Sequence, residues 1–216
     1  MSIEDVLGIV GCIFSEYAPE STCLEFITEK LKWLKHSQIL SLDVCEPIIN
    51  EFISNCSHCK TIDLGSFIGD LSPLSRKKGM PIRTINLGSF NGDLSPLRGM
   101  PIQAIHLWSF TGDLSPLRGA LIQTIYLNSF NGSLSPLGGM PIQTIHLNSF
   151  NGDLSPLHGM PIQTIHLYSF NGDLSPLRGA PIQTIFLNSF NGDLSPLRDA
   201  PIKNIYPSHF KTLINK

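Results

Sequence analysis

The sequence contains few charged residues and no long apolar run. Only 15% of its 216 residues are Asp, Glu, Lys or Arg, and its formal net charge is -2. So small a charge gives no electrostatic basis for binding nucleic acid or an anionic membrane. No apolar run reaches the ~18 residues that span a bilayer, and the acidic start from Met1 to Asp5 is unlike a secretory signal. We therefore expect an intracellular, cytoplasmic protein that binds neither nucleic acid nor membrane.

Cysteines and catalytic motifs are also scarce. The five cysteines are odd in number, and all of them precede residue 60. We interpret them as free thiols in a reducing compartment. The isolated pair Cys56 and Cys59 is too weak a pattern to predict a zinc site. The sequence contains no phosphate-binding loop, no H-E-x-x-H and no G-x-S-x-G. We expect no catalytic residues, no metal and no cofactor, and hence a protein that is not an enzyme.

What the sequence has in abundance is repetition. The motif F-x-G-x-L-S-P-L occurs seven times, with its Phe at positions 67, 90, 110, 130, 150, 170 and 190. The step is constant from Phe90 onward, and only the first is longer, because Ser75–Lys78 lengthen a loop. A fixed period of about 20 residues predicts a solenoid, in which each unit buries its apolar side chains against its neighbours.

Each unit has the pattern of a short strand followed by a return, the segment that leads the chain back to the start of the next strand. Ile102, Ile105 and Leu107 are aliphatic at the spacing I-x-x-I-x-L, which favours a strand. On the return, Asp113 or the serine before Pro116 is placed to cap a short helical turn, with Pro116 at its first position. The pattern therefore predicts one strand and one helical turn in every unit.

These residues carry a family resemblance. The pattern I-x-x-I-x-L-x-x-F followed by D-L-S-P-L resembles the leucine-rich repeat over about residues 60–205, and the return is similar to internalin-like repeats. The segment P-x-x-T-I-x-L followed by F-N is similar to the FNIP repeat. The resemblance implies an α/β leucine-rich-repeat solenoid with a concave parallel β-sheet, which we assign to residues 38–205.

One position departs from the family. Where the family has a ladder asparagine, this sequence has Phe, as at Phe110, and an Asn usually follows it, as at Asn131 and Asn151. Either the repeat uses a phenylalanine spine with a displaced Asn, or our register is shifted by one residue. A parallel β-helix of another kind is the structural alternative.

Two columns of residues vary between otherwise near-identical units. If Ile105 and Leu107 point inward, the alternation of side chains along a strand places both columns on the outer surface of the concave sheet. Aromatic side chains anchor interfaces, so we expect a protein partner of this monomeric chain to bind there. The alternative is that the rings stack on one another as cross-strand pairs. The candidate contact residues are His106, Trp108, Tyr126, Asn128, His146, Asn148, His166, Tyr168, Phe186 and Asn188.

Two further columns carry charge. One holds an Asp in most units, such as Asp113, and the other often holds an Arg, such as Arg118. Identical acids repeated once per turn predict structural capping rather than an acid/base pair. The arginine column predicts a solvated edge with weak ion pairs, and anion binding is the alternative.

The chain does not repeat before residue 38. Residues 1–37 carry two capping-box patterns, Ser2-x-x-Asp5 and Thr22-x-x-Glu25, each followed by apolar residues at helical spacing. We expect a helical cap that shields the first core layer. The alternative is an F-box-like segment, and the resemblance then implies a substrate adaptor that docks on a Skp-type subunit of a cullin–RING ubiquitin ligase. The first strand is expected near Ile39, and residues 206–216 are expected to form a C-terminal tail.

Overall fold

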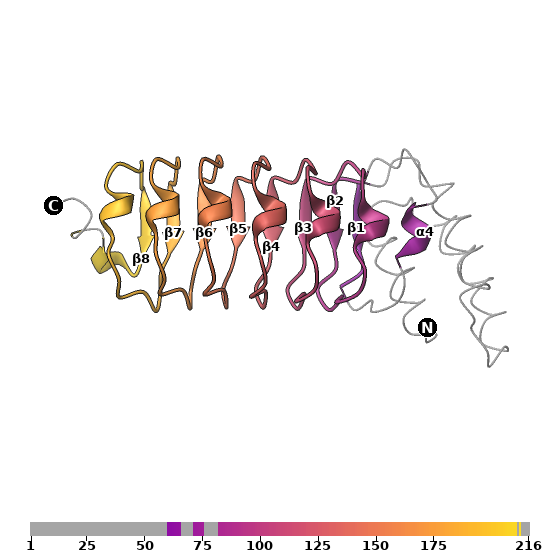
Figure 1. The fold of residues 1–216 in the computed structure, drawn as a ribbon, viewed down its shortest axis with the longest axis horizontal. Helices are drawn as coiled ribbons and strands as arrows, with labels where there is room; N and C mark the ends of the chain where they lie inside the picture. Colours follow the sequence, from indigo (N-terminus) through magenta and orange to yellow (C-terminus); the bar gives the residue numbers. More distant parts are fainter. Residues whose placement is uncertain (1–59, 66–70, 76–81, 211, 213–216) are drawn as a thin grey trace, which may run out of the picture.

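A computed structural model of the chain describes residues 60–65, 71–75, 82–210 and 212. The expected helical cap or F-box-like segment at residues 1–37, and the strand expected near Ile39, lie outside these residues. Within them, short strands alternate with short helical turns in a repeat solenoid (Figure 1). None of the helices in this part of the chain is long and apolar enough to cross a membrane.

Eight short strands form one parallel sheet in which each strand pairs with the next in the chain (Figure 1). They are β1 (Thr61–Asp63), β2 (Thr84–Asn86), β3 (Ala104–His106), β4 (Thr124–Tyr126), β5 (Thr144–His146), β6 (Thr164–His166), β7 (Thr184–Phe186) and β8 (Asn204–Tyr206). Equivalent residues are partners, as Ile105 is with Ile125. Ile62 pairs with Ile85 in the same way, so the longer first spacing is absorbed outside the sheet.

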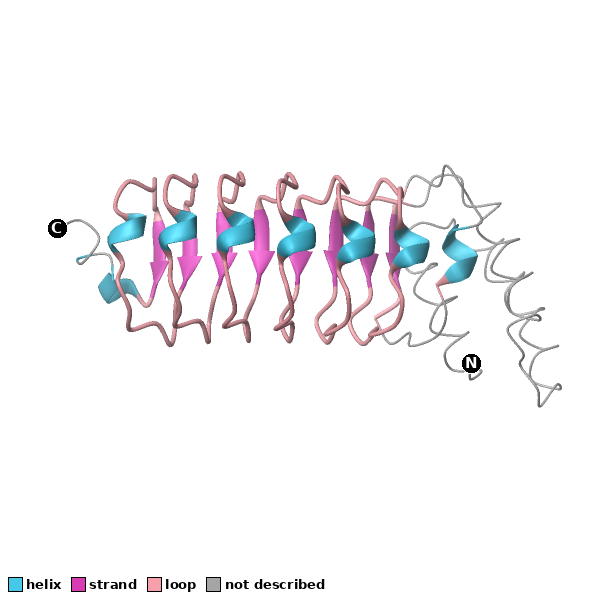
Figure 2. Cartoon of the chain, viewed as in Figure 1, coloured by secondary structure: helices cyan, strands magenta, loops and turns pink. Residues whose placement is uncertain are grey.

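The returns run along the side of the solenoid opposite the sheet and contain single helical turns (Figure 2). The first of these turns is α4 (Ser72–Ser75), and six 3₁₀ turns follow. They are η1 (Ser95–Leu97), η2 (Ser115–Leu117), η3 (Ser135–Leu137), η4 (Ser155–Leu157), η5 (Ser175–Leu177) and η6 (Ser195–Leu197). Each 3₁₀ turn is the sequence Ser-Pro-Leu, so the repeated Ser-Pro step has a structural role.

The aspartate column hydrogen-bonds to the start of these turns, as the sequence predicts. The turn begins at Ser115 and not at Pro116, however, so Asp113 lies one residue before the N-cap Leu114. The backbone N–H of Ser115 donates a hydrogen bond to Asp113 Oδ1 at 2.8 Å, and the same bond recurs in four other units. Ser133 replaces the aspartate in one unit, and its hydroxyl accepts the N–H of Ser135 at a longer 3.2 Å. The Ser115 hydroxyl and N–H stabilise the ionised carboxylate, and they lower the pKa of Asp113 below its usual value.

A tight turn after each 3₁₀ turn explains one glycine of the repeat. Arg118 has φ -53° and ψ 127°, Gly119 has φ 73°, and the N–H of Ala120 donates to the carbonyl of Leu117. These are the angles of a type II turn, which favours glycine at its third position. The last unit has Asp199 there, and its turn changes accordingly, since the preceding residue adopts φ -57° and ψ -38°.

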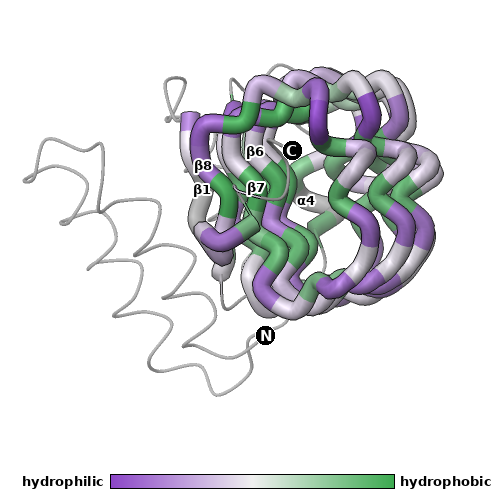
Figure 3. The backbone as a smooth tube through the Cα atoms, turned by 90° about the vertical axis from the view of Figure 1, so that its left-hand side faces the viewer, coloured by the Kyte–Doolittle hydropathy of each residue, from purple (hydrophilic) through white to green (hydrophobic). Residues whose placement is uncertain are grey.

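The interior is filled by the aliphatic and phenylalanine side chains of the repeat. Viewed along the solenoid, successive units lie almost behind one another, so their hydrophobic residues superimpose (Figure 3). In one unit the buried set is Ile102, Ile105, Leu107, Phe110, Leu114 and Leu117. No polar or charged residue is buried in the described part of the chain. The inward register of Ile105 and Leu107 predicted from the sequence is confirmed.

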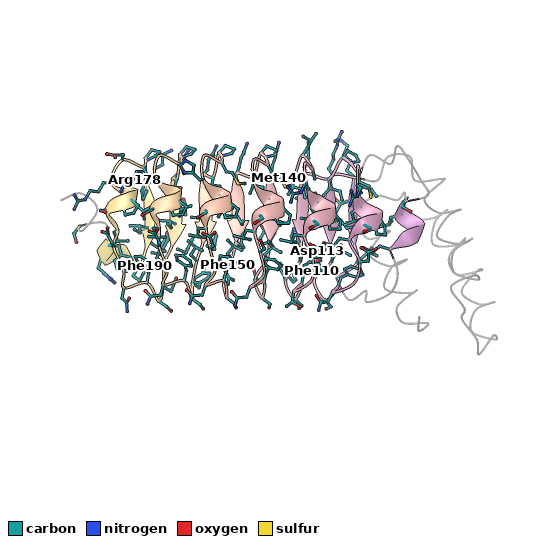
Figure 4. All side chains as sticks on the ribbon, viewed as in Figure 1. Phe110, Asp113, Met140, Phe150, Arg178 and Phe190 are labelled. Atoms are coloured by element: carbon teal, nitrogen blue, oxygen red, sulfur yellow. The ribbon has the colours of Figure 1, made fainter. Side chains whose placement is uncertain are left out.

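The phenylalanines form a spine and the asparagines beside them form a ladder. Figure 4 shows Phe110, Phe150 and Phe190 aligned along the solenoid, and all three are buried. Each ring covers a glycine of its own unit. A Cβ placed on Gly152, for example, would lie 2.9 Å from Phe150 Cζ. On the exposed side, Asn151 Oδ1 accepts the backbone N–H of Asn171 at 3.0 Å. The first alternative from the sequence, a phenylalanine spine with a displaced asparagine, is therefore correct.

The C-terminal end of the sheet is closed. Pro207 occupies the position at which the preceding unit has Leu187, whose N–H donates to the next strand. Proline has no N–H to offer to a further strand. The chain then turns through η7 (Ser208–Phe210), and Phe210, one repeat step after Phe190, is buried. The spine thus extends into the segment expected from the sequence to be a C-terminal tail.

Candidate functional site

The first variable column lies on the outer surface of the sheet. Along β3, Ile105 is buried while His106 is half-buried, and this alternation recurs in β2 and in β4 to β7. The parallel register places His106 opposite Tyr126 and Tyr126 opposite His146. The column therefore brings together side chains that lie a full repeat apart in the sequence.

The rings of this column lie against one another along the solenoid, and they are stacked from Tyr126 to Tyr206, while His106 is tilted by 33° against Tyr126. Their centroids are 4.3 Å apart for His106–Tyr126, 4.2 Å for Tyr126–His146, 3.7 Å for His146–His166, 4.1 Å for His166–Phe186 and 4.5 Å for Phe186–Tyr206. We call these six residues the ring stack. Adjacent strands are ~4.8 Å apart, so rings on neighbouring strands come into contact. The stacking predicted as the alternative role of this column is what the structure shows.

Tyr206 is a member of the stack that sequence reasoning did not identify. It lies on β8 directly opposite Phe186, and 45% of its surface is exposed. Extending the column by one more repeat step would have found it.

The second variable column stands beside the ring stack. Trp108 lies 5.6 Å from His106, between ring centroids, and is tilted by 53° from it, and 42% of its surface is exposed. Its indole covers Gly88 on the preceding unit, where a Cβ would lie 3.1 Å from Trp108 Cε3. Tyr168 is likewise tilted by 53° from His166. Trp108 and Tyr168 thus lean out of the stack, and Gly88 leaves room for the indole.

Between Trp108 and Tyr168 the second column presents two amides. Asn128 and Asn148 are half-buried, and the Oδ1 atom of each is buried without a hydrogen-bond partner among the described residues. Asn188, beyond Tyr168, is exposed. Buried amide oxygens are nearly always hydrogen-bonded in folded proteins, so these two groups have hydrogen-bonding capacity that the described part of the chain does not use.

Two histidines of the ring stack, His146 and His166, are held in their neutral form. Burial lowers the pKa of His146 to about 4, and the neighbouring imidazoles of His166 and His106 add to the effect. Burial also lowers the pKa of His166. Each ring is covered by its neighbours and has little water to stabilise an imidazolium. The stack therefore carries no charge on these two residues at neutral pH.

The described residues do not form a metal centre. In the described ranges, no three His, Cys, Asp or Glu side chains lie close enough together to hold a metal ion. His146 and His166 stack with an angle of 17° between their planes, so their ring nitrogens do not converge on one point. The CxxC pair at Cys56 and Cys59 lies outside the described residues.

The edges of the solenoid carry the charged columns. Figure 4 shows Arg178 on the edge opposite the phenylalanine spine, and Met140 on the same edge. The nearby Arg118 contributes to the lowered pKa of Asp113, although less than the hydrogen bonds from Ser115 do. Leu121, 64% exposed, takes a position that is proline in the neighbouring units and was not singled out from the sequence.

The ten candidate contact residues therefore fall into two groups. His106, Tyr126, His146, His166 and Phe186 belong to the ring stack. The other five residues, Trp108, Asn128, Asn148, Tyr168 and Asn188, form the row beside it, which we call the outer row. In the comparison with known proteins, no family model matches the chain and no curated protein matches it.

Proposed function

We propose that this chain is a non-catalytic binding protein, a solenoid of the leucine-rich-repeat type, that holds another protein on the surface formed by the ring stack and the outer row. We call this surface the sheet face. The observation that carries the proposal is the position of Trp108. A large indole lies half in solvent on a glycine platform, in a column whose other members include Asn and Gly.

Physical chemistry favours a binding role for such a residue. Tryptophan and tyrosine provide a large contact area with few rotatable bonds, and they dominate the energetics of many interfaces. Each ring of the stack beside them is held in place by the rings on the adjacent strands, so the surface is ordered without a partner. A preorganised surface loses less conformational entropy on binding.

The size of the sheet face limits the affinity. The five strands from β3 to β7 span about 24 Å at ~4.8 Å per strand, and the six residues of each unit that run from just before its strand to the outer row span at most about 20 Å. The resulting area, on the order of 500 Å², is smaller than the ~800 Å² per partner of a standard stable interface. We expect a dissociation constant in the micromolar range, unless the partner also contacts an edge of the solenoid.

The test is a comparison of two full-length chains as bait in host lysate, with the recovered proteins identified by mass spectrometry. The variant Trp108→Asn/Tyr168→Asn gives both positions the residue that other units carry there, as at Asn128 and Asn188. The change is therefore within the range that the fold already accepts, and circular dichroism checks that it folds. Leu121→Pro, which restores the residue of the neighbouring units on the edge, is the matched control.

A partner retained by the intact chain and by Leu121→Pro, but lost from the double variant, is the expected result. If all three chains recover the same proteins, or none, the sheet face is not the binding site. A Skp-type subunit recovered equally by all three would point instead to docking through residues 1–37.

A further inference from the structure

The sheet face contains no charged residue across five successive strands. The segments 103–109, 123–129, 143–149, 163–169 and 183–189 contain no Asp, Glu, Lys or Arg. Their outward positions carry Gln, Thr or Ala, the rings, the outer row, and Ser. The nearest charged residues at the equivalent positions of the flanking units are Arg83 before β2 and Lys203 before β8.

The absence of charge is confined to the sheet face, because most of the same units carry charged residues elsewhere. Four of the five units that contribute strands β3 to β7 carry an Asp before Leu-Ser-Pro-Leu and an Arg or His after it, such as Asp113 and Arg118. The fifth unit has Ser133 and Gly138 at these positions. These charged residues are exposed at the turns, away from the sheet. Charge is thus confined to the edges, while the sheet face offers amides, hydroxyls and rings.

His146 and His166 add no charge to the sheet face at neutral pH. His146 and His166 face each other, with Tyr126 on one side and Phe186 on the other. No carboxylate from β3 to β7 lies on this face to stabilise an imidazolium, and Asp63, on β1, is in register with Asn86 two strands before Tyr126. Burial lowers the pKa of both histidines, in accordance with this arrangement.

A face of this kind discriminates between partners by their charge. A charged group that is buried against it loses water and finds no counter-charge, which disfavours its binding. An amide or hydroxyl group finds hydrogen-bonding partners among the exposed polar side chains of this face, such as Gln123, Ser149 and Asn188. The surface is specific because it does not compensate the desolvation of a charged group on the wrong partner.

We propose that the sheet face from β3 to β7 binds an uncharged polypeptide segment, rich in amide, hydroxyl and aromatic side chains, and rejects segments that place Lys, Arg, Asp or Glu against it. This proposal rests on the proposed function and defines the chemistry of the partner's contact surface.

The experiment uses a phage library of random dodecapeptides, panned at neutral pH on the intact chain and on Trp108→Asn/Tyr168→Asn. We expect the peptides that depend on Trp108 and Tyr168 to be depleted of charged residues relative to the unselected library. Introducing one Lys or one Glu into such a peptide should weaken its binding about tenfold, the equivalent of ~1.4 kcal/mol. Peptides that depend on both residues but carry charges as often as the library does would overturn the proposal and leave the proposed function standing.

A charge introduced into the protein provides the matched control. Asn188→Asp places a carboxylate at an exposed position of the outer row, and Asn148→Asp places one at a half-buried position between Trp108 and Tyr168. On either variant that folds, the Lys-containing peptide should regain about tenfold in affinity while its Glu-containing counterpart should not. Equal affinities of the two peptides on both variants would overturn the charge argument.

Two further outcomes separate the possible failures. If no peptide distinguishes the intact chain from Trp108→Asn/Tyr168→Asn, the sheet face does not bind polypeptide and both proposals fail. If cellohexaose or chitohexaose shifts the fluorescence of the intact chain but not of Trp108→Asn, while no peptide binds, the occupant is a neutral glycan and the polypeptide assignment is wrong.

Discussion

Replacing Phe150 by Ala removes one ring from the centre of the phenylalanine spine. Phe150 is fully buried, with the spine residues Phe130 and Phe170 in the adjacent units, and it covers Gly152. Gly152 has no side chain that could move into the vacated space. The neighbouring rings cover their own glycines in the same way, so they are not free to fill it either.

The expected loss of stability can be estimated from the buried area. A phenylalanine side chain removes roughly 150–200 Å² of apolar surface from water, which corresponds to about 4 kcal/mol at ~25 cal/mol per Å². The methyl group of alanine recovers part of this, but the cavity that remains adds a further cost. We expect Phe150→Ala to lower the free energy of unfolding by ~3–5 kcal/mol.

The assay is urea unfolding of the intact chain and the variant, followed by far-ultraviolet circular dichroism. Phe150→Leu is the matched control and should cost less than about 2 kcal/mol, because it fills most of the same volume. In a solenoid each unit supports its neighbours, so the loss at a central unit should reduce the stability of both halves. A loss below about 1 kcal/mol for Phe150→Ala would refute the packing described here.

Three further predictions concern the glycines and the ring stack. Gly152→Ala should destabilise the chain in thermal melts because its Cβ would lie 2.9 Å from the buried Phe150 ring; equal melting temperatures would contradict this close approach. Gly159→Ala should cost about 1 kcal/mol or more because Gly159 has φ 71°, whereas Arg98→Gly, which copies Gly138, should cost less; the reverse order would contradict the turn assignment. Stability should fall as the pH drops from about 6.5 towards 4, because His146 binds protons in the unfolded chain while its folded pKa is about 4. Partial exposure limits this loss to about 1–2 kcal/mol; His146→Tyr, which copies Tyr126, should reduce it, and an unchanged pH profile would contradict it.

The repeat period carries most of the information about the fold. The spacing of Ile102, Ile105 and Leu107 predicts which side chains point inward, and the structure buries all three. The recurrence of Asp before Leu-Ser-Pro predicts the caps that the structure shows, as at Asp113. These features follow from local chemistry repeated once per unit, so the pattern is visible without coordinates.

The arrangement of the candidate site is less accessible from the sequence. A column of rings is compatible both with stacking and with contact to a partner, and only the ring planes distinguish a stack member such as His146 from a tilted residue such as Trp108. The platform at Gly88 depends on the rotamer of the indole, which column composition does not encode. The position of Phe210 in the spine is predictable from the sequence, because Phe210 lies one repeat step after Phe190.

The closed C-terminal end limits how a protein of this type can change its length. An internal unit offers the same pairing groups on both sides, so inserting or removing one whole unit between β3 and β7 leaves every remaining strand with a matching neighbour. The last unit lacks this property, because Pro207 gives no N–H to a following strand and Phe210 occupies the next spine position. Units can therefore be added by duplication between existing units but not after the last one. Each added unit lengthens the sheet face by one strand, while Pro207 and Phe210 still close the C-terminal end.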